Sequence, residues 1–241
     1  SFFVFIFVGS PIALALGGSA LIYIVLFANV SPLIVMQQIL ASVNTYTLLA
    51  VPFFIMAGAL METGGISKRI VSFCQALVGH FTGGLALVVV LASVFFAAMT
   101  GSGVAACAAV GGIMIPMMVK NGYHSDFACA LQATSGIFGP LIPPSIVMVL
   151  YAVYANQSVS TMLMAGVGPG LMQAAMVCIL AVWICHRRGY AGVGSFSMKR
   201  LLKEFGSSFW ALLAPVIILG GIYSGVVTTT EVACVSVIYA L

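Results

Sequence analysis

The chain has 241 residues, of which 63% are hydrophobic and 5% are charged, and its formal net charge is +4. A soluble domain carries about 25% charged residues to keep its surface in water, so this composition excludes a water-soluble globular protein of this length. Such a chain must be solvated by lipid, where only helices and closed barrels satisfy the hydrogen bonds of the backbone. Its apolar runs are long and lack the period-two alternation of a barrel. We therefore predict an all-α protein of polytopic membrane helices.

The first part of the chain contains two apolar runs and two weaker segments. Residues 2–28 form one apolar run, which we expect to be a single spanning helix, and residues 46–61 form a second span. Between them, residues 29–42 contain a Ser-Pro step and two glutamines, which suits a short interfacial helix. In residues 66–78 the apolar side chains recur with a helical period, which predicts an amphipathic helix at the membrane interface.

The middle of the chain contains two short apolar arms, residues 84–99 and 104–118. At a helical rise of ~1.5 Å per residue each arm is about 23 Å long, less than the ~30 Å of a hydrocarbon core. The linker between them, residues 100–103, is small and uncharged, whereas a water-exposed loop is usually longer and more polar. We therefore predict a re-entrant helical hairpin whose tip lies inside the membrane.

A broken helix is predicted to follow the hairpin. Residues 126–138 and 145–156 read as two short helices, and the segment 139–144 between them contains three prolines, which cannot all be helical. Residues 158–186 then predict a full span, and residues 207–227 predict another span after a basic connector. Finally, Thr228 and Glu231 have the spacing of a capping box that opens a further helix.

The basic residues predict the topology. With a cytoplasmic N-terminus, a re-entrant hairpin and a single crossing by the broken helix, all eight fall on the cytoplasmic side, as the positive-inside rule requires. A hairpin that crossed the membrane twice would give the same sides. Because they lie in short clusters between apolar runs, these residues indicate topology and not binding to nucleic acid. They are Lys68, Arg69, Lys120, Arg187, Arg188, Lys199, Arg200 and Lys203.

The hairpin tip and the helix break are the candidate binding site. At membrane depth, backbone groups without helical partners are tolerated only where they line a cavity or bind a ligand. In secondary transporters that ligand is typically a coupling cation, with an anionic substrate near the N-termini of half-helices. We predict a Na⁺ site with no organic cofactor and no catalytic residue; the alternative is that the small residues only allow close helix packing. The candidate residues are Gly101, Ser102, Gly103, Thr134, Ser135, Gly136, Gly139 and Ser145.

Other functions remain open from the residues alone. An ion channel would not need a hairpin and a break that meet at mid-depth, and a structural subunit would leave the tip unexplained. An intramembrane hydrolase would need a base beside Ser102, but the histidines and the acidic residues lie at the ends of apolar runs. Gln132, one turn before the break, is placed either to face the cavity or to hydrogen-bond a neighbouring helix.

Several motifs resemble the large membrane subunit of the tripartite ATP-independent periplasmic (TRAP) transporters. They are TGSGVAACAAVGGIMIP at 100–116, MVKNGY at 118–123, GPLIPPS at 139–145, PFFIMAG at 52–58, ETGGIS at 62–67 and GGIYSG at 220–225. The resemblance implies an elevator-type carrier of organic acids, driven by Na⁺, in the bacterial inner membrane. It also implies two partners, a periplasmic substrate-binding protein and a small four-helix membrane subunit. Hairpin and broken helix would then form one cation site.

On this resemblance the chain divides into three regions. Residues 1–65 would be scaffold-type helices, residues 66–156 the transport-type region, and residues 157–241 further membrane helices. Family members are much longer and contain a second, inverted repeat, so we expect this chain to correspond to the first repeat. Many members also carry an acidic residue just after the tip, where this chain has Ala106 and Cys107, so no role of that carboxylate carries over.

Overall fold

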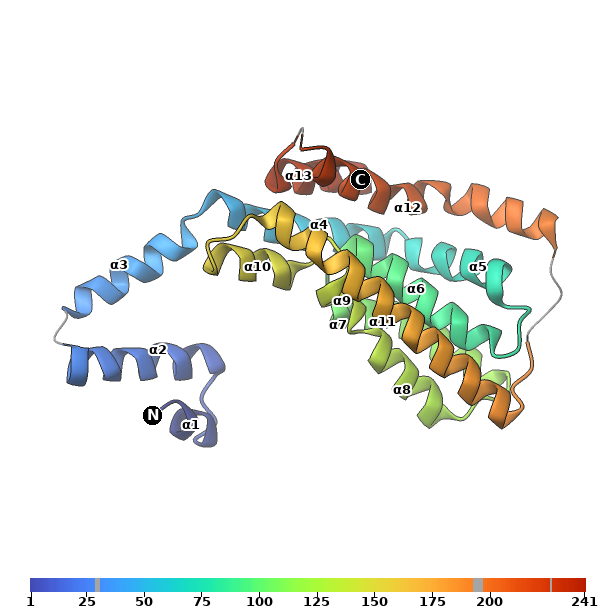
Figure 1. Ribbon diagram of the computed structural model, residues 1–241, viewed down its shortest axis with the longest axis horizontal. Coiled ribbons are helices and arrows are strands. Elements are labelled where there is room, and N and C mark those ends of the chain that lie inside the picture. The colour runs from blue at the N-terminus through green and yellow to red at the C-terminus, as the bar shows by residue number, and fades with distance from the viewer. Residues whose placement is uncertain (29–30, 193–196, 226) are drawn as a thin grey trace. The chain divides into compact units, whose positions relative to one another are not determined.

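The computed structural model describes residues 1–28, 31–192, 197–225 and 227–241, and all regular structure within them is helical (Figure 1). Contacts within the chain define two compact units, Ser1–Tyr46 and Thr47–Leu241. Among the described residues, four helices are long and apolar enough to cross a membrane, and the broken helix raises this to five if it counts as one span. The predicted all-α polytopic membrane fold is confirmed.

The first unit differs from its prediction. Residues 2–28 do not form one helix: α1 (Phe2–Phe7) ends before Gly9, whose φ is +83°, and α2 (Ile12–Tyr23) begins after Pro11 and continues into a π-helical turn. A positive φ and a proline without an amide donor both interrupt a helix, although the surrounding residues are apolar. Next comes α3 (Pro32–Val43), where the prediction placed a short helix; residues 29 and 30 lie outside the described part.

The remaining helices belong to the second unit, except that the first residue of the 3₁₀ turn, Tyr46, is the last residue of the first unit. In chain order they are a 3₁₀ turn (Tyr46–Leu49), α4 (Ala50–Thr63), α5 (Ile66–Val78), α6 (Gly84–Thr100), α7 (Gly103–Lys120), α8 (Ser125–Ser135), α9 (Phe138–Leu141), α10 (Ile146–Tyr154), α11 (Val159–Arg188), α12 (Met198–Ser224) and α13 (Thr229–Ala240). The span predicted at 46–61 corresponds to the 3₁₀ turn with α4, and the span predicted at 158–186 corresponds to α11.

Helix α6 lies at the centre of the second unit. Of its 17 residues 13 are buried, and it packs against α5, α7, α8 and α11. Its buried residues are mostly valine, alanine and phenylalanine, which bring apolar surface and no unpaired side-chain donor into the interior. This helix therefore anchors both the hairpin arm α7 and the helices that follow it.

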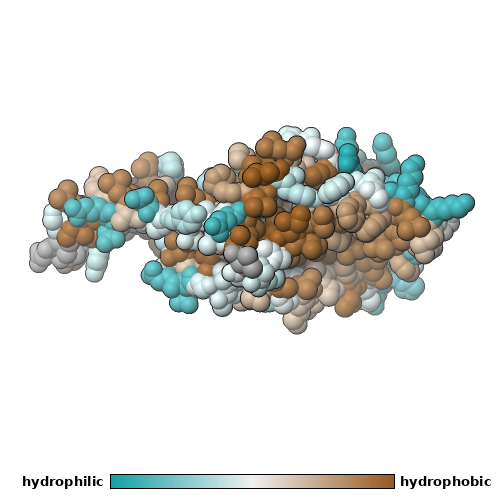
Figure 2. Space-filling view, turned by 90° about the horizontal axis from the view of Figure 1, so that it is seen from above, coloured by the Kyte–Doolittle hydropathy of each residue, from teal (hydrophilic) through white to brown (hydrophobic). Residues whose placement is uncertain are grey.

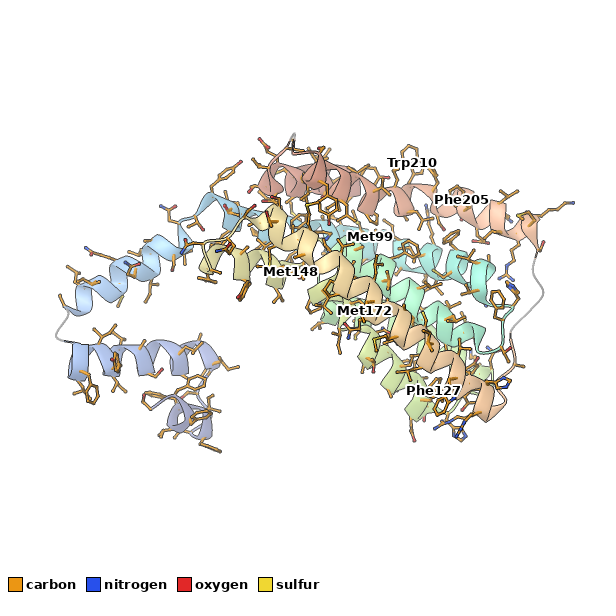
Figure 3. All side chains as sticks on the ribbon, in the orientation of Figure 1. Met99, Phe127, Met148, Met172, Phe205 and Trp210 are labelled. Carbon is orange, nitrogen blue, oxygen red and sulfur yellow. The ribbon has the colours of Figure 1, made fainter. Side chains whose placement is uncertain are left out.

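The outward surface of the second unit is apolar. Met172 of α11 and Trp210 of α12 are both more than half exposed, and Figure 3 shows the Trp210 ring on the outside of α12. In Figure 2, hydrophobic side chains cover much of this unit, and hydrophilic ones gather at one end. An apolar surface of this kind is compatible with lipid and not with water.

Two helices near the basic residues refine the predictions. The bounds of α5 agree with those of the predicted amphipathic helix, and its buried residues include Ile70, Val71 and Cys74. Helix α12 begins at Met198, not at residue 207, so the predicted basic connector is itself helical. Lysine, arginine and leucine are good helix formers, which explains the extension. The two helices are joined by a hydrogen bond of 2.9 Å from Ser208 Oγ to the carbonyl oxygen of Arg69.

The broken helix is confirmed, and its break starts later than predicted. Helices α8 and α9 together make an angle of 42° with α10. Gly139 and Pro140 lie inside α9 and not in the break, which occupies residues 142–145. Proline is tolerated there because the first turn of a helix needs no amide donor from it.

Candidate functional site

The hairpin tip is a tight turn between α6 and α7. Gly101 has a φ of +63°, a conformation that favours glycine, and its amide closes the last turn of α6 with a hydrogen bond of 2.8 Å to Ala97 O. Ser102 is the N-cap of α7: its Oγ accepts from the amide of Ala105 at 3.4 Å. One residue thus ends the first helix and the next begins the second.

The tip packs against the broken helix, backbone on backbone. A Cβ added to Gly103 would collide with the carbonyl oxygen of Gly136, and one added to Gly139 would collide with the amide of Gly103. Within the break itself, the carbonyl oxygen of Pro144 faces the tip, because a Cβ added to Gly101 would collide with it. Only residues without a side chain allow this approach, so the glycines predicted from the sequence serve a direct spatial purpose.

A cavity of about 550 Å³ opens at this junction. Its wall combines the tip, the first turn of α7, the end of α8 and the start of α10. The residues that line it are Gly101, Ser102, Gly103, Val104, Cys107, Ala133, Gly136, Ile137, Pro140, Ile146 and Val147. Four of the eight predicted site residues, three at the tip and Gly136, therefore share one cavity.

The other four predicted residues do not line this cavity. Gly139 lies behind the tip, in contact with the backbone of Gly103. The hydroxyl of Ser145 donates to Pro140 O at 2.7 Å and caps α10. The hydroxyls of Thr134 and Ser135 each donate at 2.8 Å to a carbonyl oxygen of their own helix, and Thr134 is exposed. The protons of these two hydroxyls are therefore used within α8.

A second cavity, of about 290 Å³, also borders the tip and is lined in part by a carboxylate. Glu62 lines it together with Thr100 and Ser102. The sequence places Glu62 at the end of an apolar run, and no role in the site was predicted for it. The sequence has no local signal for this position, which follows from the packing of α4: a Cβ added to Gly58, four residues earlier on the same face, would be 3.2 Å from Thr100 Cα.

The chemistry available at the tip is that of neutral oxygens. No group of three or more histidine, cysteine, aspartate or glutamate side chains that could hold a metal ion occurs among the described residues. A cation at the tip would therefore be bound by carbonyl and hydroxyl oxygens, which are ligands for hard ions. Glu62 adds one negative charge in the adjoining cavity.

A comparison with protein families decides the class of the chain. The family described as "Tripartite ATP-independent periplasmic transporter, DctM component" matches residues 1–241. The chain belongs to this family. Membership of the DctM family confirms the resemblance that the motifs around the tip and the break carried.

Individual relatives support the assignment. The chain is 41% identical over 236 residues to the sialic acid TRAP transporter large permease protein SiaM of Vibrio cholerae, covering 98% of this chain and 55% of the relative. It is 45% identical over 235 residues to the C4-dicarboxylate TRAP transporter large permease protein DctM of the same species, covering 97% and 52%. It is 39% identical over 241 residues to the isethionate TRAP transporter permease protein DctMQ of Oleidesulfovibrio alaskensis, covering 100% and 38%. The chain spans about half the length of the first two.

Proposed function

We propose that the chain is part of a Na⁺-coupled secondary transporter that moves a small organic anion inward across the bacterial inner membrane. It would receive the anion from a periplasmic substrate-binding protein and work beside a small membrane subunit. Support comes from the DctM family and from the relatives, whose names give sialic acid, a C4-dicarboxylate and isethionate as their substrates. All three of those compounds are organic anions.

The observation that carries the proposal is the meeting of four helix ends at the tip and the break. Helices α6 and α9 end there, and α7 and α10 begin there. The last carbonyl groups of a helix have no intrahelical partner and carry partial negative charge, so they suit a cation. The first amide groups carry partial positive charge and suit an anion. One junction therefore offers both kinds of backbone group beside a cavity.

The Na⁺ site would form around the tip. Na⁺ must exchange its hydration shell for several oxygens at fixed distances, and the interior of a helix has none to offer because its carbonyl groups are already hydrogen-bonded. Here the ends of two segments touch through Gly103 and Gly136. We place the ion beside Ser102, which borders both cavities. In this proposal the hairpin is re-entrant, and the transport region moves across the membrane as an elevator.

Uptake into proteoliposomes tests this function. The transporter that contains this chain, reconstituted with its small subunit and binding protein, should accumulate one of the labelled anions sialate, succinate or isethionate when an inward Na⁺ gradient is applied. Replacing Na⁺ by K⁺ should abolish accumulation. Uptake that persists unchanged without a Na⁺ gradient would contradict the coupling, and uptake without saturation would favour a channel. Hydrolysis of the anion would favour the enzyme alternative.

A further inference from the structure

Gln132 ties three helices together inside the second unit. It belongs to α8 and is 3% exposed. Its Nε2 donates to Ser93 Oγ of α6 at 3.4 Å and to the carbonyl oxygen of Ala106 in α7 at 3.3 Å. Gly111 makes room for this side chain, because a Cβ there would lie 2.9 Å from Gln132 Cγ. The amide therefore joins both arms of the hairpin to the helix that leads into the break.

These hydrogen bonds lie one helical turn from the tip contact. Ala106 donates its amide to Ser102 O at 3.1 Å, and Gly136 donates its amide to Gln132 O at 3.0 Å. Cys107 Sγ also donates to Gln132 O, at 3.5 Å. The Gln132–Ala106 bond and the close approach of Gly103 to Gly136 thus join the same two segments of the chain, one helical turn apart. A shift of α7 along α8 would break the bond and separate the tip from the break together.

The side chain is a poor choice for packing alone. Gln132 Oε1 is buried and has no hydrogen-bond partner among the described residues. A buried acceptor without a donor costs free energy, and an apolar side chain of similar volume would avoid that cost. A polar group in an apolar interior gives directional bonds in return, and these fix one arrangement of the helices against others. This gain concerns register and not stability.

We propose that Gln132 is a positioning residue of the cation site: it sets the register of the hairpin arms against α8 and thereby the spacing between tip and break at which Na⁺ binds. The inference rests on the function proposed above. Gln132 itself does not line the cavity at the tip. It acts through the backbone of α7 and α8, one turn away from the oxygens that would bind the ion.

Two substitutions separate positioning from packing. In the reconstituted transporter, Gln132→Met removes the hydrogen bonds to Ser93 and Ala106 together with the unpartnered oxygen, and it puts an apolar side chain of similar length in their place. We expect the Na⁺ concentration for half-maximal uptake to rise on the order of fivefold. The maximal rate at saturating Na⁺ should stay near that of the wild type, and the melting temperature in Na⁺-free buffer should stay the same or rise. Ser93→Ala removes one of the two acceptors and should give a smaller rise in the same direction.

A double variant and a control complete the test. Ser93→Ala combined with Gln132→Met should be no worse than Gln132→Met, because the amide is the shared partner. Cys129→Ala, three residues earlier in the same helix at an exposed position outside the candidate site, should match the wild type. Two results in a Na⁺-dependent wild type would contradict the inference. In the first, both single variants keep the half-maximal Na⁺ concentration of the wild type. In the second, they lose melting temperature and maximal rate while that concentration does not change. If the wild type shows no dependence on Na⁺, the proposed function itself is wrong, and the inference falls with it.

Discussion

The glycines of the tip meet two different physical requirements. Gly101 needs a positive φ, which other residues rarely adopt. Gly103 and Gly139 instead need space, because the atoms facing them belong to the backbone and cannot turn away as a flexible side chain would. Elsewhere in α7, a Cβ added to Gly112 would have no atom within 4 Å, and the residue is exposed, so its lack of a side chain serves neither purpose.

This contrast gives a prediction with a control in the same helix. Gly103→Ala should destabilise the protein by about 1–3 kcal/mol, because the new methyl group forces the tip away from Gly136. It should also weaken the stabilisation of the protein by added Na⁺. Gly112→Ala should instead stabilise by about 0.5–1 kcal/mol through helix propensity. Thermal unfolding at several Na⁺ concentrations measures both effects, and equal behaviour of the two variants would show that the contact at the tip is not tight.

At the scale of elements, the length of the hairpin arms does not settle how deep the tip lies. At ~1.5 Å per residue, α6 is about 26 Å long and α7 about 27 Å, close to the ~30 Å of the hydrocarbon core. Helix α7 also has the length and composition of a spanning helix. The stronger argument is the contact of the tip with the broken helix, because a tip in water would not need to pack its backbone against α9 and α10.

Labelling of introduced cysteines tests the depth of the tip. In a background without the six native cysteines, of which Cys107 borders the tip cavity, Ser102→Cys should react slowly with a membrane-impermeant thiol reagent. Ser158→Cys, at the exposed N-cap of α11, should react fast because it lies at the end of a span. Bound Na⁺ should slow the reaction at position 102 further. Fast and complete labelling at position 102 from the periplasm, unaffected by Na⁺, would contradict a re-entrant tip.

Elements with a strong local signal were predicted well from the sequence. The bounds of α5 follow from its period and its flanking glycines, and the capping box at Thr228 is present, with Glu231 Oε2 accepting from the Thr228 amide at 2.7 Å. The break inside residues 2–28 was missed because Gly9 and Pro11 stand in an otherwise apolar run. A local kink of the backbone leaves little trace in hydropathy.

The structure brings the predicted backbone positions of the site together but turns some of the predicted hydroxyls elsewhere. Glycine-rich turns are visible in the sequence, so the residues at the tip and Gly136 could be named from it, and the structure brings them to one cavity. The direction of a hydroxyl depends on how a helix is rotated, and this rotation is set by tertiary packing. The sequence therefore does not show that Thr134 and Ser135 donate to carbonyl oxygens of their own helix. The position of Glu62 beside the tip depends on α4 crossing the hairpin, which no local pattern encodes.

At the scale of the whole second unit, one end gathers charge and aromatic rings. Tyr123, after α7, stacks on Tyr190, after α11, with 4.2 Å between ring centroids, and Gly83, before α6, donates its amide to Tyr190 O at 3.3 Å. Arg188 lies 5.6 Å from the centroid of Phe127, which Figure 3 places at this end. The open end of the hairpin and the end of α11 therefore lie on the same side of the unit, as does Lys120 at the end of α7.

The side of the membrane that the C-terminal end of α11 faces can be predicted with fewer assumptions than the side on which residue 1 lies. The cytoplasmic N-terminus was predicted by counting residues 2–28 as one crossing, and the structure divides that segment. The end of α11 needs no such count, because Arg187 and Arg188 are the last two residues of a helix of 30 residues. At ~1.5 Å per residue this helix is about 45 Å long, which is enough to cross the ~30 Å hydrocarbon core. Arg187 lies 4.5 Å from the ring centroid of Trp183, a residue type enriched at membrane interfaces.

We therefore expect the two ends of α11 to be accessible from opposite sides of the membrane. In the same cysteine-free background, Arg187→Cys should react with an impermeant thiol reagent only in inside-out vesicles, because the positive-inside rule places this end in the cytoplasm. Ser158→Cys should react only in right-side-out vesicles. Reaction of both cysteines from one side would mean that α11 does not span the membrane. The reversed pattern would mean that the unit is inserted in the opposite orientation, with the open end of the hairpin facing the periplasm.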